Sequence, residues 1–142
     1  MNVLVIHGPN LHLLGKRRPE IYGKATLAQL NAALREHAAW LKVKVRIFQS
    51  NCEGEIIDLL TANAAWADAL VINPAAYTHY SYAIRDAIEA LELPAAEVHL
   101  SDISKREPFR RISVIKPVCQ AQFMGEGIFS YLKALDLCAG IR

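Results

Sequence analysis

Short apolar runs alternate with helix-patterned segments along the whole chain, and this alternation restricts the fold more than any other feature. The runs expected to form strands are Val3–Ile6, Val43–Phe48, Ala69–Ile72, Ala95–Leu100 and a fifth within Ser113–Met124. Between them, apolar residues recur at the spacing of one helix face. Such alternation is typical of a parallel sheet with helices on both faces. The sequence therefore predicts a three-layer α/β fold with a five-stranded parallel sheet, as one domain of residues 1–142.

Two capping signals indicate where helices should begin. Thr26 and Gln29 have the T-x-x-Q spacing of a capping box, and leucines at helical spacing follow them. Ser50 and Glu53 repeat this signal before another apolar, helix-patterned segment. We therefore expect one helix to be capped by Thr26 and the next by Ser50.

Polar side chains gather where the first, third and fourth strands end. They are Asn10, His12, Lys16, Arg17, Arg18 and Tyr22, then Asn73, Thr78, His79 and Tyr80, and then His99, Ser101, Lys105, Arg106, Arg110 and Arg111. In open α/β sheets, ligands bind beyond the carboxyl ends of the strands. Arginine suits a carboxylate ligand, and tyrosine and histidine suit proton transfer. The sequence therefore predicts a site for a small anionic substrate at this edge.

The connection after the first strand is unusually long. It spans about 17 residues, whereas strand-to-helix connections usually take about 2–6. Long loops in compact domains are often lids or binding loops, although an ordinary surface loop is the alternative. Within it, Arg17 and Arg18 precede Tyr22 by a few residues, and nearby cations favour the ionised form of a phenol. Tyr22 is thus a candidate base, although a packing role explains it equally well at this point.

Glu97 and His99 form a second candidate pair. They are two residues apart on a predicted strand, so both side chains point to the same side. A carboxylate in that position can orient and polarise an imidazole. The alternative is that His99 is simply a hydrogen-bonded core histidine.

Several familiar motifs are absent from the sequence. The segment Gly8–Lys16 has the wrong glycine spacing for a phosphate loop, and Gly125-Glu126-Gly127 lacks the third glycine of a dinucleotide fingerprint. His7 and His12 have no acidic partners at metal-ligand spacing. We therefore expect neither a cofactor nor a metal.

Composition narrows the class of protein further. A formal net charge of +2 is too small to indicate nucleic-acid binding, so the basic strand ends favour a small anion. Cys52, Cys119 and Cys138 are odd in number and form no CxxC pair, which is typical of reduced thiols. No apolar stretch is long enough for a membrane span or a signal peptide. We expect a soluble cytoplasmic protein without nucleic-acid or membrane partners.

Three segments make the sequence recognisable: GPNLHLLGKRRPEIYG, NPAAYTHYSYAIRDA and EVHLSDISKREPFRR. Together they resemble the type II 3-dehydroquinate dehydratases, and the resemblance covers essentially the whole chain. It implies a flavodoxin-like fold and a dodecamer built from trimers. It also implies removal of water from 3-dehydroquinate through an enolate to give 3-dehydroshikimate, without metal or cofactor, in the shikimate pathway or in quinate breakdown.

The resemblance implies a catalytic role for each of five residues. Tyr22 resembles the base that removes a proton beside the ketone, and Arg17 the residue that keeps it ionised. Asn10 would hold the water that stabilises the enolate. His99 resembles the acid that protonates the departing hydroxyl, with Glu97 behind it. A binding protein that holds a polyhydroxy acid without turnover is the alternative, but it would have no need of Tyr22, Arg17 and His99.

Substrate-binding positions also follow from the resemblance. They are Asn73, His79, Asp86, Leu100, Ser101, Arg106 and Arg110. The Leu100 and Ser101 amides would bind the substrate carboxylate. Asn73, His79 and Arg110 would bind its hydroxyls, and Arg106 is the second loop arginine. Asp86 is implied to reach the site of a neighbouring subunit.

A few positions depart from the family pattern, none of them catalytic: His12, Arg18, Tyr80, Lys116 and Glu126. Arg18 matters most, because it replaces a glutamate beside Arg17 and adds a cation. We expect an active enzyme whose loop is more mobile than is usual in the family.

Overall fold

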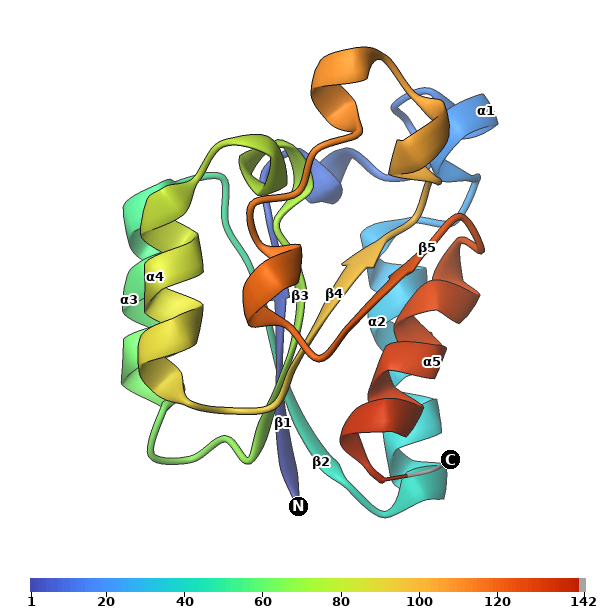
Figure 1. Cartoon of the computed structure of the whole chain (residues 1–142). Coiled ribbons are helices and arrows are strands. Elements are labelled where there is room, and N and C mark those ends of the chain that lie inside the picture. The colour runs from blue at the N-terminus through green and yellow to red at the C-terminus, as the bar shows by residue number, and fades with distance from the viewer. Residues whose placement is uncertain (141–142) are drawn as a thin grey trace.

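A five-stranded parallel sheet forms the centre of the computed structural model, which describes residues 1–140 (Figure 1). The strands are β1 (Asn2–His7), β2 (Lys44–Gln49), β3 (Ala69–Asn73), β4 (Ala95–His99) and β5 (Ala121–Met124). Their order is β2-β1-β3-β4-β5, and every neighbouring pair is parallel. This is the strand order of flavodoxin-like sheets, so the predicted fold class is confirmed.

Helices cover both faces of the sheet (Figure 1). On one face lie α2 (Leu27–Leu41) and α5 (Ile128–Cys138), and on the other lie α3 (Glu53–Asn63) and α4 (Tyr82–Leu91). Among the described residues, no helix has the length and apolar character needed to cross a membrane.

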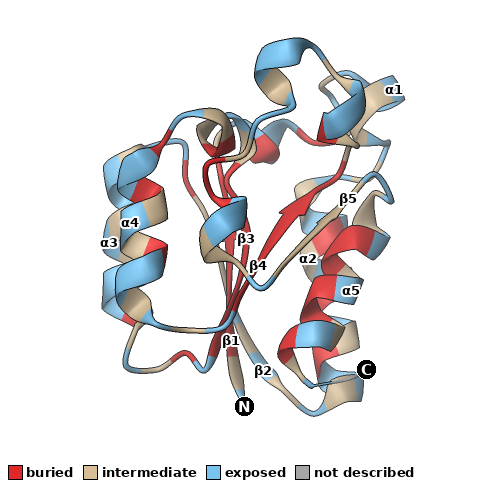
Figure 2. Cartoon of the chain, in the orientation of Figure 1, coloured by how far each residue is buried: buried red, intermediate tan, exposed pale blue. Residues whose placement is uncertain are grey.

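Side chains of the central strands alternate between two hydrophobic cores. Val3 and Val5 pack with residues of α2 and α5, whereas Leu4 and Ile6 pack with residues of α3 and α4. Figure 2 shows the buried interior of the sheet between its two helical layers. Because both faces are covered, a central strand has no solvent side, and its sequence is a continuous apolar run.

One of the two capping predictions is confirmed and the other is wrong. Thr26 Oγ1 accepts a hydrogen bond from Gln29 N (3.2 Å), and Gln29 Oε1 accepts one from Thr26 N (2.9 Å). By contrast, α3 begins after Cys52, which makes no side-chain cap. The buried Ser50 instead accepts from Cys52 N in a local turn, and the Glu53 carboxylate accepts from Ser81 Oγ (2.6 Å). A local turn thus holds Ser50 and a tertiary contact holds Glu53, so the predicted capping pair does not form.

Short helical turns fill the connections at the carboxyl ends of the strands. The long first connection contains η1 (Leu11–Leu13) and α1 (Pro19–Tyr22). The others at this end are η2 (Ala75–His79), η3 (Ile103–Lys105) and η4 (Pro108–Arg110), whereas η5 (Lys116–Val118) lies just before β5. Figure 1 shows the connections after β1, β3 and β4 together at one end of the sheet.

Gly8 allows two of these strand ends to approach closely. Its N–H donates to the Asn73 carbonyl (2.8 Å), and a Cβ on Gly8 would lie 2.6 Å from the Pro74 carbonyl oxygen. A side chain at this position would push β1 and β3 apart where the site begins.

Candidate active site

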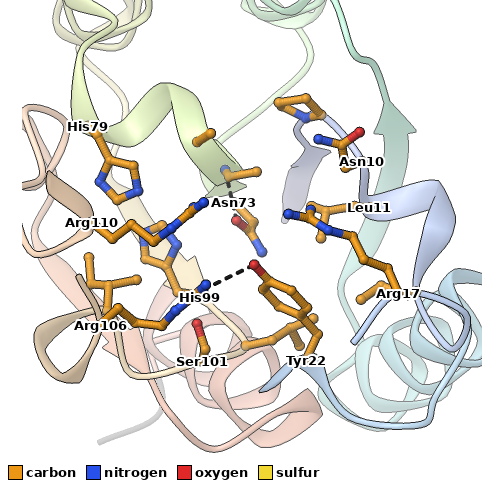
Figure 3. A pocket seen from close by; sticks show the side chains of 16 residues that line it. Asn10, Leu11, Arg17, Tyr22, Asn73, His79, His99, Ser101, Arg106 and Arg110 are labelled. Carbon is orange, nitrogen blue, oxygen red and sulfur yellow. Dashed lines mark hydrogen bonds between the residues drawn. The ribbon is translucent and has the colours of Figure 1, made fainter. Parts of the chain in front are cut away.

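A cavity of about 220 Å³ opens at the carboxyl ends of β1, β3 and β4 (Figure 3). The predicted site residues that line it are Asn10, Arg17, Tyr22, Asn73, His79, His99, Leu100, Ser101, Arg106 and Arg110. Glu97 lies behind His99 and does not line the cavity. Asp86 is exposed on α4, away from this chain's own cavity lining.

The phenol of Tyr22 lies between two guanidinium groups. Tyr22 is the last residue of α1, and Arg106 Nη1 donates to its hydroxyl oxygen (3.0 Å; Figure 3). The guanidinium carbons of Arg17 and Arg106 lie 5.0 and 5.3 Å from the ring centroid. Positive charges beside a phenol stabilise its ionised form. This arrangement therefore suits a tyrosine that accepts protons.

The opposite wall carries a buried imidazole–carboxylate pair. His99 Nε2 lies 2.6 Å from Glu97 Oε1, and the two residues are 5% and 0% exposed. Glu97 also accepts hydrogen bonds from Thr78 Oγ1, from Ser113 Oγ and from Gln122 Nε2.

These contacts keep the Glu97 carboxyl ionised. Burial raises the pKa of Glu97, but the hydrogen bonds from His99, Thr78 and Ser113 outweigh burial and hold that pKa below its ordinary value. Glu97 is therefore a carboxylate that accepts the Nε2–H of His99. The imidazole Nδ1 is left as the atom that can exchange a proton with a ligand in the cavity.

Asn10 is held by a turn at the end of β1. Its backbone is left-handed (φ 68°), and its N–H donates to Asn51 Oδ1 (3.0 Å), which also accepts from Gln49 Nε2 (3.1 Å). The Asn73 side chain, at the end of β3, accepts from Ala75 N (3.0 Å) and faces the same cavity (Figure 3). The cavity thus receives two amide side chains from neighbouring strands.

A basic wall completes the site. His79 donates from Nδ1 to the Ile112 carbonyl (2.7 Å). Burial, together with the charges of His99 and Arg110, lowers the pKa of His79, so the ring is neutral and presents Nε2 as an acceptor. Arg110 Nε lies 2.9 Å from Glu107 Oε2. This wall can therefore both donate hydrogen bonds to a polyhydroxy anion and accept hydrogen bonds from it.

Among the described residues, no cluster of three or more histidine, cysteine or acidic side chains could hold a metal ion.

Comparisons with known proteins identify the family of this chain. The sequence profile described as Dehydroquinase class II matches residues 1–139. The chain belongs to this family. It is 52% identical over 141 residues to 3-dehydroquinate dehydratase of Pelotomaculum thermopropionicum, which covers 99% of this chain and 98% of that protein. It is 51% identical over 142 residues to 3-dehydroquinate dehydratase of Roseiflexus castenholzii, which covers 100% of this chain and 90% of that protein.

A solved structure from the same family also has the same fold. The crystal structure of type II dehydroquinase from Butyrivibrio crossotus superposes with a TM-score of 0.95 at 44% identity and covers 97% of each chain. The resemblance found in the sequence is therefore confirmed at the level of the family and of the fold.

Some site residues of this family member are not evident from its sequence. Arg106 donates a hydrogen bond directly to the Tyr22 hydroxyl, although the family resemblance identifies Arg106 only as a second loop arginine. Thr78, Ser113 and Gln122 surround Glu97, but they lie 16 to 25 residues away along the chain. The sequence carries no local signal for contacts of this kind.

The positions that depart from the family pattern all lie outside the cavity lining. They are His12, Arg18, Tyr80, Lys116 and Glu126, and each is exposed. Arg18 Nε pairs with Glu20 Oε1 (3.1 Å), so this arginine has a counter-charge within its own loop. Glu126 pairs with Lys133 Nζ (2.6 Å).

Proposed function

We propose that the chain is a type II 3-dehydroquinate dehydratase that converts 3-dehydroquinate to 3-dehydroshikimate and water through an enolate. One observation carries the proposal: a phenol flanked by two guanidinium groups faces a histidine–carboxylate pair across one small cavity. Elimination of water uses a base to remove the proton and an acid to protonate the leaving hydroxyl, and this cavity offers a candidate for each. The names of the relatives above support the same reaction.

The first step removes a proton from the carbon beside the ketone. The Tyr22 oxygen takes the proton, with Arg17 and Arg106 stabilising its charge before transfer. The electron pair moves onto the ketone oxygen, and a water held by Asn10 donates to the resulting enolate. Aligned donors at developing charge are usually a large contribution to catalysis.

The second step expels the hydroxyl. The enolate collapses to the conjugated product, the carbon–oxygen bond breaks, and His99 supplies the proton that turns the leaving group into water. Glu97 stabilises the protonated imidazole before transfer. Tyr22 then returns its proton and His99 regains one by exchange with water, which restores the starting state.

The rest of the cavity binds the substrate. The backbone amides of Leu100 and Ser101, with the Ser101 hydroxyl, bind the carboxylate. Asn73, His79 and Arg110 bind the hydroxyl groups. The chain works without a cofactor or metal, as one cytoplasmic catalytic domain that serves aromatic biosynthesis or quinate breakdown.

The oligomer is part of the proposal. We expect a dodecamer of four trimers, in which the exposed Asp86 on α4 reaches the site of a neighbouring subunit. Sedimentation equilibrium gives the mass. Asp86→Asn should then lower turnover without changing that mass, whereas a monomer of full activity would contradict this part.

A direct assay tests the reaction. Purified protein mixed with 3-dehydroquinate should produce the ultraviolet absorbance of the conjugated product. Borohydride added with substrate should not inactivate the protein, and a chelator should not slow it. No turnover at any protein concentration would refute the proposed function.

A further inference from the structure

The hydroxyl of Ser113 connects the carboxylate behind His99 to the backbone of a distant connection. Ser113 is half-buried between η4 and η5 and does not line the cavity. Its Oγ donates to Glu97 and lies 2.9 Å from Oε1 and 2.8 Å from Oε2. The same oxygen accepts hydrogen bonds from Ile115 N (3.2 Å) and Lys116 N (3.0 Å), so the start of η5 fixes the place of this hydroxyl.

The two neighbours of Ser113 in the chain hold η2, which carries His79 to the cavity. The Ile112 carbonyl accepts from His79 Nδ1 (2.7 Å), and Val114 N donates to the Thr78 carbonyl (2.8 Å). Neither contact involves the side chain of Ser113. Removing the Ser113 hydroxyl should therefore leave this segment and His79 in place.

The available hydrogens favour one arrangement around the carboxylate. Each hydroxyl has one hydrogen, and the ionised Glu97 can only accept. Thr78 donates to Oε1, where His99 also donates, and Gln122 Nε2 donates to Oε2 (3.0 Å). If Ser113 donated to Thr78 Oγ1 (3.0 Å) instead, its oxygen would face Oε2 at 2.8 Å with no hydrogen between them. Ser113 is therefore the second donor to Oε2.

This donor limits how strongly Glu97 attracts the proton of His99. Hydrogen bonds to a carboxylate stabilise its charge and make it a weaker base. Without the Ser113 hydrogen, Oε2 would keep only Gln122, and Glu97 would attract the Nε2–H of His99 more strongly. The imidazole would then release a proton to a leaving group less readily.

We propose that Ser113 is a positioning residue for His99: its hydroxyl fixes the Glu97 carboxylate and moderates the pull of that carboxylate on the imidazole. The hydroxyl acts only through Glu97, because Ser113 has no place in the cavity lining. The use of His99 as the acid rests on the proposed function.

The first test is Ser113→Ala, which removes the hydroxyl. We expect kcat to fall about three- to tenfold, as for one lost hydrogen bond, and KM to stay within about twofold because Ile112 still holds His79. Ser130→Ala is the matched control. Ser130 is 0% exposed and its Oγ accepts from Glu126 N (3.1 Å), so this variant also loses an acceptor for a backbone N–H but no donor to Glu97. Ser130→Ala should keep the parent kcat.

The second test separates the donor from the contacts with η5. Ser113→Thr keeps the hydroxyl and should keep kcat within about twofold of the parent. Gln122→Met removes the other donor to Oε2 without touching the backbone of η5, and it should reproduce the fall in kcat. The proposal is overturned by an unchanged kcat in Ser113→Ala or Gln122→Met, by an equal fall in Ser130→Ala, or by an equal fall in a Ser113→Thr variant that melts at the parent temperature.

A readout independent of turnover keeps this proposal distinct from the proposed function. In proton spectra of the intact protein, the Nε2–H of His99 should resonate far downfield, because Glu97 Oε1 accepts it at 2.6 Å. His99→Gln identifies this signal by removing it. The signal should move further downfield in Ser113→Ala and in Gln122→Met but not in Ser130→Ala. An unmoved signal in Ser113→Ala refutes the role of Ser113 even in an active enzyme, whereas absent turnover with the expected shifts refutes only the dehydratase.

Discussion

The two walls of the cavity hold the Tyr22 phenol and the His99 imidazole in different ways. Tyr22 ends a four-residue helix within a long connection, and a single hydrogen bond from Arg106 holds its hydroxyl. His99 lies on β4 with almost no exposure, and its partner Glu97 has three further donors around it. Figure 2 shows this contrast between the buried strand and the partly exposed connections above it.

From this difference we expect the wall that carries Tyr22 (the mobile wall) to move and the wall that carries His99 (the rigid wall) to stay in place. Breaking the contact between Arg106 and Tyr22 frees the connection to open for substrate, at the low cost of one partly buried hydrogen bond. Moving His99 would uncover a buried carboxylate, which is far more costly. On the proposed mechanism, the base would therefore be assembled when the loop closes, whereas the acid would always be in place.

The largest expected effect comes from the mobile wall. Tyr22→Phe should lower kcat by about 10²- to 10⁴-fold, the usual contribution of a general base, because no other phenol lines the cavity. Its melting temperature should stay close to that of the parent, since the ring still packs. Tyr82→Phe, at an exposed tyrosine of α4, is the matched control and should retain full turnover. More than a tenth of the parent activity in Tyr22→Phe would assign the base elsewhere.

A change in the rigid wall should lower both the stability of the protein and its turnover. Glu97→Gln places an amide NH₂ among the donors Ser113 and Gln122, so buried donors would face one another. We expect a loss of about 3 kcal/mol in the free energy of unfolding, as for a broken buried pair. Turnover should fall less than in Tyr22→Phe, because the remaining carbonyl still accepts from His99.

Denaturant unfolding and the turnover assay measure both effects of Glu97→Gln. Glu89→Gln, the same change at an exposed position of α4, should alter neither. If Glu97→Gln proved as stable as the parent, the four residues that donate hydrogen bonds to this carboxylate would not stabilise the rigid wall.

Most of the fold could be predicted because it depends on patterns that are local in the chain. A strand that is buried on both faces has a continuous apolar sequence, such as Ala69–Ile72. The Thr26 capping box is complete within four residues. Ser50 and Glu53 show the limit of such patterns. Their spacing is that of a cap, but Glu53 bonds Ser81, which is 28 residues away.

The site follows the same division between local and distant contacts. Tyr22 and His99 could be located because functional residues follow strands in this fold. The bond from Arg106 to Tyr22 spans 84 residues, and the bond from His7 to Tyr131 spans 124. No periodicity or motif within one segment encodes such pairs. The sequence therefore identifies His7 only as the end of an apolar strand.

A third prediction concerns pH and separates His7 from Glu97. Burial lowers the pKa of His7 from 6.5 to about 4. Between these two pH values, His7 is protonated in the unfolded chain but neutral in the folded chain. This contribution to stability is complete above pH 6.5 and is lost as pH falls toward 4, reaching a loss of about 2 kcal/mol by pH 5. The lowered pKa of Glu97 acts in the same direction but only below about pH 4.5.

Urea unfolding at pH 7.5 and at pH 5 measures this loss. The parent should lose stability across the interval, and His7→Asn should lose less by about 2 kcal/mol, because it has no imidazole to protonate on unfolding. Equal losses in the two proteins would mean that His7 takes up a proton in the folded state as well.

The smallest effect should come from a change at Arg18. Its direction shows whether Arg18 loosens the loop or holds it closed. The sequence suggests that an extra cation beside Arg17 loosens the loop. In the structure, however, Arg18 pairs with Glu20. It also helps, after a backbone hydrogen bond and the charges of Arg106 and Arg110, to hold the pKa of Glu107 on the facing connection below its ordinary value.

A glutamate at position 18 would therefore repel both Glu20 and Glu107 and favour the open loop. Chymotrypsin cleavage after Tyr22 reports the open fraction, since Arg106 holds that ring when the loop is closed. We expect Arg18→Glu to be cut about two- to fivefold faster, the scale of one exposed ion pair, and Lys24→Glu, with the same charge change, to be cut at the parent rate. Slower cleavage of Arg18→Glu would instead mean that Arg18 loosens the loop, and that the contacts of the mobile wall with Glu20 and Glu107 do not hold it closed.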